Sequence, residues 1–109
     1  MQPPSNEVLI DVAVDFSSTP GGRYKAEGEF SGEEFREKFL EPPIREGKNL
    51  AIDLDGPEGF TSSFLEEAFG GLVRIFGKAV VSRFRFVADA KPHRARKAAG
   101  YVQRAVDAK

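Results

Sequence analysis

A short run near the middle of the chain limits the fold more than any other feature. Leu50-Ala51-Ile52-Asp53-Leu54 is nearly all apolar, as expected of a central strand that is covered on both faces. A second strand is predicted where Phe84, Phe86 and Ala88 alternate with Arg83 and Arg85, ending near Asp89. The chain is therefore expected to form an α/β protein.

The N-terminal part predicts two further strands. Val8, Ile10, Val12, Val14 and Phe16 share one face of the first, and Tyr24, Ala26, Gly28 and Phe30 share one face of the second. Residues 17–22, Ser-Ser-Thr-Pro-Gly-Gly, have the composition of a turn. We expect an antiparallel hairpin here.

Three helices are predicted between and after these strands. Ser31 and Glu34 have capping-box spacing and open a helix over about residues 32–40, which Pro42-Pro43 should end. Residues 62–76 carry an apolar stripe, in which Gly70-Gly71 implies a close approach to the sheet or to a partner. A last helix opens at Pro92. The order β-β-α-β-α-β-α predicts a small mixed four-stranded sheet with helices mainly on one side, in a single domain over residues 1–109 with an ordered core of about 8–106.

Composition excludes several kinds of chemistry. The 109 residues include no cysteine and one histidine, so a disulfide framework, a thiolate nucleophile and a cysteine-rich zinc site are absent. A single histidine leaves carboxylates as the only plausible metal ligands. We predict no metal and no cofactor. Residues 1–7 lack the features of a signal peptide and no apolar run reaches membrane-spanning length, so we expect a cytoplasmic protein with no membrane partner.

The net charge of −1 conceals an imbalance along the chain. Residues 1–70 carry 15 acidic and 6 basic side chains, whereas residues 71–109 carry 2 acidic and 10 basic ones. Such asymmetry is typical of a partner surface. No nucleic-acid-binding motif accompanies the basic part, so nucleic acid is not the expected partner. We predict a second interface on the last helix, formed by Arg94, Lys97, Tyr101 and Arg104, which would dock on an acidic surface such as that of a second copy in a homodimer.

Residues 53–63, Asp-Leu-Asp-Gly-Pro-Glu-Gly-Phe-Thr-Ser-Ser, are the densest group of chemistry-bearing side chains. They join a strand end to a helix start, where ligands often bind in α/β folds. Asp53-Leu54-Asp55-Gly56 resembles the first motif of haloacid-dehalogenase-type phosphatases, which implies Asp53 as nucleophile, Asp55 as general acid/base and magnesium as cofactor. Pro57 stands where that family usually has threonine, and no later acidic pair follows. This phosphatase, or a small-ligand or nucleotide-binding module at the same loop, is the alternative hypothesis.

The same segment resembles the STAS domains of bacterial anti-sigma-factor antagonists, and more closely a group of STAS-like bacterial domains of unknown function. The likeness lies in the order strand, loop, Ser-Ser and helix, in the turn at residues 20–24, Pro-Gly-Gly-Arg-Tyr, and in the helix start at residues 62–70, Ser-Ser-Phe-Leu-Glu-Glu-Ala-Phe-Gly. The resemblance implies that Ser63 is the serine that a partner kinase phosphorylates, with Ser62 the preceding serine and Thr61 at the position before the pair.

From that resemblance we expect a non-catalytic signalling domain that regulates transcription by switching protein partners. Its partner would be a histidine-kinase-like ATPase or an anti-sigma-type regulator. The phosphoacceptor candidates are Ser63, Ser62 and Thr61, and the predicted partner-binding loop comprises Asp53, Asp55, Gly56, Glu58, Gly59, Phe60 and Phe64. A purely structural interpretation is also open, in which Ser63 with Glu66 forms a capping box, or Thr61 caps the helix while Phe60 packs against Leu65.

Overall fold

A computed structural model describes residues 6–108, and the predicted absence of a signal peptide falls mainly on residues outside this range. Three strands, β1 (Glu7–Asp11), β2 (Asn49–Asp53) and β3 (Phe84–Val87), form a parallel sheet in the order β1-β2-β3. The apolar run at residues 50–54 predicted the central strand correctly. The α/β class is confirmed, but the sheet is not mixed and the described residues contain three strands in place of the predicted four.

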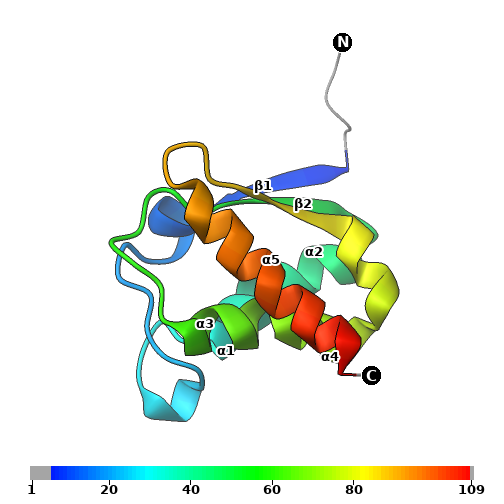
Figure 1. Ribbon diagram of the computed structural model, residues 1–109, viewed down its shortest axis with the longest axis horizontal. Coiled ribbons are helices and arrows are strands. Elements are labelled where there is room, and N and C mark those ends of the chain that lie inside the picture. Colours follow the sequence, from blue (N-terminus) through cyan, green and yellow to red (C-terminus); the bar gives the residue numbers. More distant parts are fainter. Residues whose placement is uncertain (1–5, 109) are drawn as a thin grey trace.

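The helices lie on one side of this sheet (Figure 1). Two helical stretches are each interrupted by a π-helical turn. The first contains α1 (Gly32–Phe35), a turn at Arg36–Leu40 and α2 (Glu41–Arg45). The second contains α3 (Ser62–Leu65), a turn at Glu66–Gly70 and α4 (Gly71–Phe76). A 3-10 helix at Lys78–Arg83 leads into β3, and α5 (Pro92–Asp107) begins with Pro92 as predicted.

The predicted hairpin is wrong. β1 ends at Asp11, whose carboxylate accepts a hydrogen bond from Val14 N at 3.2 Å, and Val12–Phe16 forms a π-helical turn. A short acidic side chain can bind a nearby backbone N–H that would otherwise pair with a neighbouring strand. The expected second strand contains a 3-10 turn at Lys25–Glu27, and Phe30 has a φ of +58°. The segment is therefore not extended, despite its alternating pattern.

The first helical stretch also runs past its predicted end. Ser31 accepts from Glu34 N at 3.1 Å, which confirms Ser31 as the cap, but the Glu34 carboxylate accepts from Phe30 N at 3.1 Å and not from Ser31 N, so the reciprocal half of the capping box is shifted by one residue. Pro42-Pro43 do not stop the helix, because the π-helical turn before them places both in the first turn of α2, where a missing N–H costs little. As a result, five α-helices replace the three expected, within the part of the chain that the structure describes.

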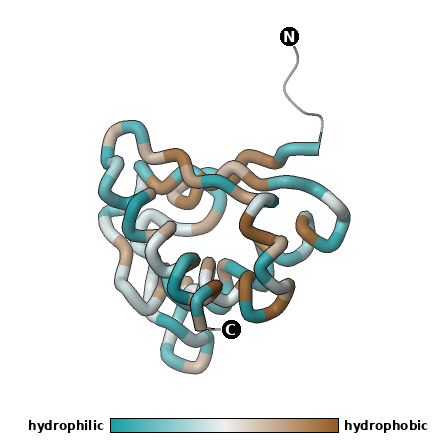
Figure 2. Tube along the Cα trace, turned by 45° about the vertical axis from the view of Figure 1, so that its right-hand side comes forward, coloured by the Kyte–Doolittle hydropathy of each residue, from teal (hydrophilic) through white to brown (hydrophobic). Residues whose placement is uncertain are grey.

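The core lies between the sheet and the helices, and hydrophobic stretches run along the strands (Figure 2). Phe35 and Phe64 are fully buried, and the ring of Phe16 lies 5.0 Å from that of Phe35. Gly32 permits the close packing of α1 on α3, since a Cβ there would lie 2.5 Å from the Phe64 carbonyl oxygen. Gly71 leaves room for Arg36, so its neighbour is another helical stretch, not the predicted sheet or partner.

Within residues 6–108, no helix covers the other face of the sheet (Figure 1). Leu9 is 66 % exposed, whereas Ala51, its neighbour in register on β2, is 2 % exposed. Arg85 on β3 reaches across to Glu7 on β1, with Nε to Oε2 at 3.0 Å. Among residues 6–108 no helix has the length and apolar character to cross a membrane.

Candidate functional site

The loop after β2 is held from within by Arg94. This side chain is 8 % exposed and donates hydrogen bonds to the carbonyl oxygens of Leu54 at 2.7 Å, Pro57 at 2.8 Å and Glu58 at 3.2 Å. Its guanidinium also lies 5.3 Å from the centre of the Phe60 ring. Arg94 was predicted to be part of an interface on α5, but its burial makes it a support for the loop.

Asp53 and Asp55 shape the same loop. An Asp53 oxygen accepts from Asp55 N at 2.9 Å, which closes a turn at the strand end. The Asp55 carboxylate accepts from Ala90 N at 3.1 Å and Lys91 N at 3.0 Å, and so fixes the chain just before α5. Among residues 6–108 no three histidine, aspartate or glutamate side chains are grouped to hold a metal ion.

Thr61 is committed to the start of the second helical stretch. Its hydroxyl oxygen accepts from Phe64 N at 2.9 Å, and the hydroxyl donates to the Gly21 carbonyl oxygen at 3.1 Å. The structural interpretation in which Thr61 is the cap is therefore confirmed. Ser62 and Ser63 follow in the first turn, and neither hydroxyl has a hydrogen-bond partner within residues 6–108.

The two serines line a hollow of about 350 Å³ between the start of α3 and the end of α5. Three arginines from different parts of the chain line it with them: Arg23 from the loop before α1, Arg74 from α4 and Arg104 from α5. Tyr101 and Glu66 complete the polar lining. We call this space the serine hollow.

A second hollow of about 290 Å³ lies next along α5. Its lining includes Glu58, Gly59 and Phe60 from the loop and Lys97 from α5. Lys97 and Tyr101 are four residues apart, so they occupy one side of the helix. The loop and α5, predicted as two interfaces, therefore meet at this second hollow, whereas the serine hollow is bordered by the two serines and by Tyr101 and Arg104 of α5.

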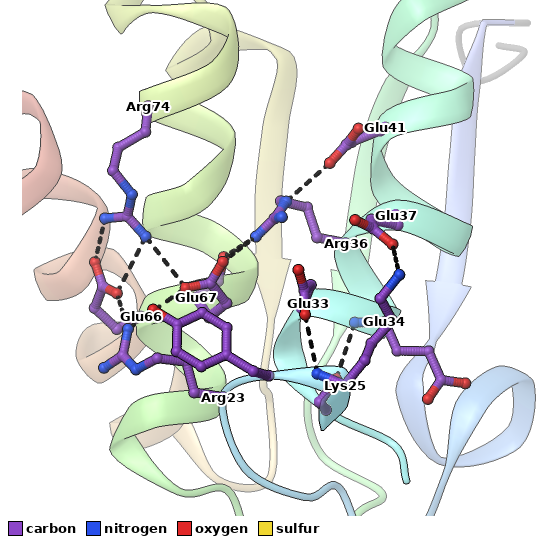
Figure 3. A network of polar contacts seen from close by, with 12 residues as sticks. Arg23, Lys25, Glu33, Glu34, Arg36, Glu37, Glu41, Glu66, Glu67 and Arg74 are labelled. Carbon is purple, nitrogen blue, oxygen red and sulfur yellow. Dashed lines mark hydrogen bonds and ion pairs between the residues drawn. The ribbon is translucent and has the colours of Figure 1, made fainter. Parts of the chain in front are cut away.

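Glu66 holds two of the three arginines of the serine hollow (Figure 3). Arg23 Nη1 lies 2.5 Å from its Oε1 and Arg74 Nη1 lies 2.5 Å from its Oε2. The hydrogen bond from Arg74 is the main reason that the pKa of Glu66 lies below its usual value; burial opposes this, and the bond from Arg23 adds to it. The bond to Glu66 likewise raises the pKa of Arg23.

A buried ion pair extends this network to the first helical stretch. Arg36 Nη1 lies 2.6 Å from Glu67 Oε2, and its Nε lies 2.8 Å from Glu41 Oε2 (Figure 3). Burial lowers the pKa of Arg36, but the bonds to Glu41 and Glu67 outweigh it and the pKa is raised. Glu67 is thus largely committed to Arg36, whereas Glu66 is shared between residues at the edge of the hollow.

Sequence reasoning missed Arg23 and Arg74 as parts of the site. Arg23 belongs to the predicted turn at residues 20–24, and 43 residues separate it from Glu66. Arg74 follows Glu66 by eight residues, a spacing that predicts no contact on a regular helix. Neither contact could be inferred from spacing, because both depend on the path of the loop and on the π-helical turn.

The sequence model of one protein family, described as a STAS-like domain of unknown function (DUF4325), matches residues 31–94. The chain belongs to this family. The matched STAS-like region begins at the cap of α1 and ends at Arg94, so it includes β2, the loop, both serines and β3. No curated protein and no solved structure matches the chain.

Several predicted site residues of this STAS-like domain lie at the surface, whereas Phe64, like Arg94, is buried. Gly56, Glu58 and Gly59 in the loop are exposed, as are Ser62 on α3 and Lys97 and Arg104 on α5. Phe60, Ser63 and Tyr101 are half-buried. Phe64 was predicted to belong to the partner-binding loop, but it is 0 % exposed because it packs against Phe35 and Phe60 in the core.

Proposed function

We propose that this STAS-like domain is a non-catalytic regulatory protein-interaction domain, and that phosphorylation of Ser63, with Ser62 second, switches its partner. The proposal rests on the different hydrogen bonding of three neighbouring hydroxyl groups. Thr61 is used by the fold, whereas Ser62 and Ser63 line an open hollow without a hydrogen-bond partner in the described chain. A hydroxyl that caps nothing is available for modification.

The partner surface in this proposal is the face that the loop shares with α5. Exposed Glu58 and Gly59 lie on one side, and Lys97 and Arg104 on the other. A kinase of the histidine-kinase-like ATPase class would supply ATP. The Ser63 oxygen would attack the terminal phosphorus, the bond to ADP would break, and the hydroxyl proton would pass to a base of the kinase. The added charge, about −1.5 to −2, would change which protein surface can dock.

The phosphatase alternative receives no support from the contacts of its two aspartates. Asp53 holds the turn, and both oxygens of Asp55 accept backbone hydrogen bonds just before α5. A nucleophile and a general acid should instead face a space that a phosphate ester could enter.

The experiment combines modification with binding. The protein is incubated with ATP and a histidine-kinase-like ATPase from the same organism. The phosphorylated residue is mapped by mass spectrometry, and affinity for that ATPase is measured for the unmodified protein, Ser63→Asp and Ser63→Ala. We expect phosphate on Ser63, weaker binding by Ser63→Asp, and unchanged binding by Ser63→Ala. Thr61→Ser keeps the capping oxygen and is the matched control. Absence of phosphate at residues 61–63, together with unchanged binding by Ser63→Asp, would refute the proposal.

A further inference from the structure

Arg23 Nη1 and Arg74 Nη2 lie 3.5 Å and 3.6 Å from Glu67 Oε1 in addition to binding Glu66, so Arg104 carries the unbalanced positive charge of the serine hollow. Arg23, Arg74 and Arg104 line it together with Glu66, which is the acidic residue of the lining. Glu66 divides its two oxygens between Arg23 and Arg74. Arg104 is exposed, lies 5.1 Å from the ring of Tyr101 and has no ion pair within residues 6–108. The lining can therefore accept another anion.

Ser63 is placed to deliver that anion. It precedes Glu66 by three residues on the same helical stretch, so the two side chains lie on neighbouring parts of one face. Both line the hollow. A phosphoryl group has three acceptor oxygens and more charge than a carboxylate, and arginine binds it with two parallel hydrogen bonds.

We propose that the phosphate of phosphorylated Ser63 is received within its own chain by Arg104, Arg23 and Arg74, and so fills the serine hollow. This inference rests on the proposed function for its source of phosphate. Arg23 and Arg74 then divide their donors between Glu66 and the phosphate, and Arg104 gains its partner. Phosphorylation closes the hollow to a partner's acidic side chain, in addition to adding charge at the surface.

The test uses the full chain with phosphoserine encoded at position 63, so that neither a kinase nor a partner is needed. Phosphorus NMR follows the second ionisation of the phosphate, whose ordinary pKa is about 6. We expect the folded protein to ionise at least half a pH unit lower than the same protein in denaturant. The charged groups facing the phosphate in the hollow are Arg23, Arg74, Arg104 and Glu66, and the Tyr101 hydroxyl is the remaining titratable group.

Variants separate the hollow from the rest of the surface. Arg104→Gln should move the phosphoserine pKa at least a third of the way back toward its value in denaturant. The same change should leave the melting temperature of the unmodified protein unchanged, because Arg104 has no ion pair within residues 6–108. Arg96→Gln, at an exposed arginine of the same helix outside the hollow, is the matched control and should change nothing. Equal ionisation in the folded and denatured protein would overturn the inference, as would equal effects of the two variants.

A further arm tests whether the hollow serves a free anion. Inorganic phosphate is titrated into unmodified protein and into the phosphoserine protein. Binding at the hollow in the first and none in the second supports the proposal, because the phosphoserine already fills the space. Equal binding by both assigns the hollow to a free ligand and overturns it. If the arginines bind the phosphoserine but no kinase modifies Ser63, the proposed function fails and the phosphate-binding site remains. If partners switch without the ionisation shift, the proposed function stands and the phosphate-binding site is refuted.

Discussion

Removing the Arg94 guanidinium tests whether this residue holds the candidate loop in place. Arg94→Met keeps most of the apolar stem but leaves the carbonyl oxygens of Leu54 and Pro57 without donors. Both residues are buried. An unpaired buried acceptor costs about 1–3 kcal/mol, so two cost about 2–6 kcal/mol. Because water can reach part of a loop, we expect the lower part of this range, about 2–4 kcal/mol.

Chemical denaturation measures the loss of unfolding free energy, which should also lower the melting temperature by about 10–20 °C. Hydrogen exchange reports on the loop itself. The Glu58 amide donates to the Ser18 carbonyl oxygen at 2.8 Å, and its exchange should accelerate more than global unfolding explains.

Arg96→Met is the matched control, since it removes an exposed arginine from the same helix and should change stability by less than about 0.5 kcal/mol. If Arg94→Met costs no more than Arg96→Met, and the Glu58 amide exchanges as before, the three carbonyl contacts of Arg94 do not hold the loop.

Three shorter predictions concern the supports of the site. Gly32→Ala should cost at least about 2 kcal/mol, because its Cβ would overlap the Phe64 carbonyl, whereas Gly59→Ala meets no atom within 4 Å and should be nearly neutral in a denaturation assay. Thr61→Ala should cost about 1 kcal/mol by removing the cap, and Thr61→Ser should restore most of it. The pKa of Glu66 lies below its ordinary 4.5 in the folded state. The contribution of Glu66 to the free energy of unfolding is therefore complete above about pH 4.5 and is lost as pH falls through the lowered pKa. In Glu66→Gln, the free energy of unfolding should depend less on pH in this range.

Elements whose apolar side chains follow a clear pattern along the sequence could be predicted from it. β2 and β3 have side chains that alternate or are wholly apolar, and α5 has a proline where a helix can begin. The hairpin failed for a physical reason. Alternation at residues 24–30 has the period of a strand, but Lys25 binds Glu37 at 2.6 Å and its backbone N–H donates to Glu33 at 2.9 Å. Those contacts to the first helical stretch replace strand pairing.

The candidate site was predicted in outline but not in its chemistry. The position of the loop and of the serines follows from the strand-loop-helix order, which is local. The role of Arg94 does not, because it flanks an apolar stripe on α5 as an exposed residue would. It is buried only because the loop after β2 folds over it. A single sequence carries no signal for such a contact.

The charge imbalance along the chain acquires a definite meaning in the folded protein. Two basic residues of the basic part, residues 71–109, pair with acidic residues of the acidic part, residues 1–70. Arg85 pairs with Glu7, and Arg74 pairs with Glu66. The other ion pairs within residues 6–108 join residues of the acidic part to one another, so most basic residues of positions 71–108 have no carboxylate partner there. On α5, Arg96, Lys97 and Arg104 have no ion pair within residues 6–108, and the last two border the hollows beside the loop and Ser63. The unbalanced charge thus collects where an acidic partner and a phosphate would compete for it.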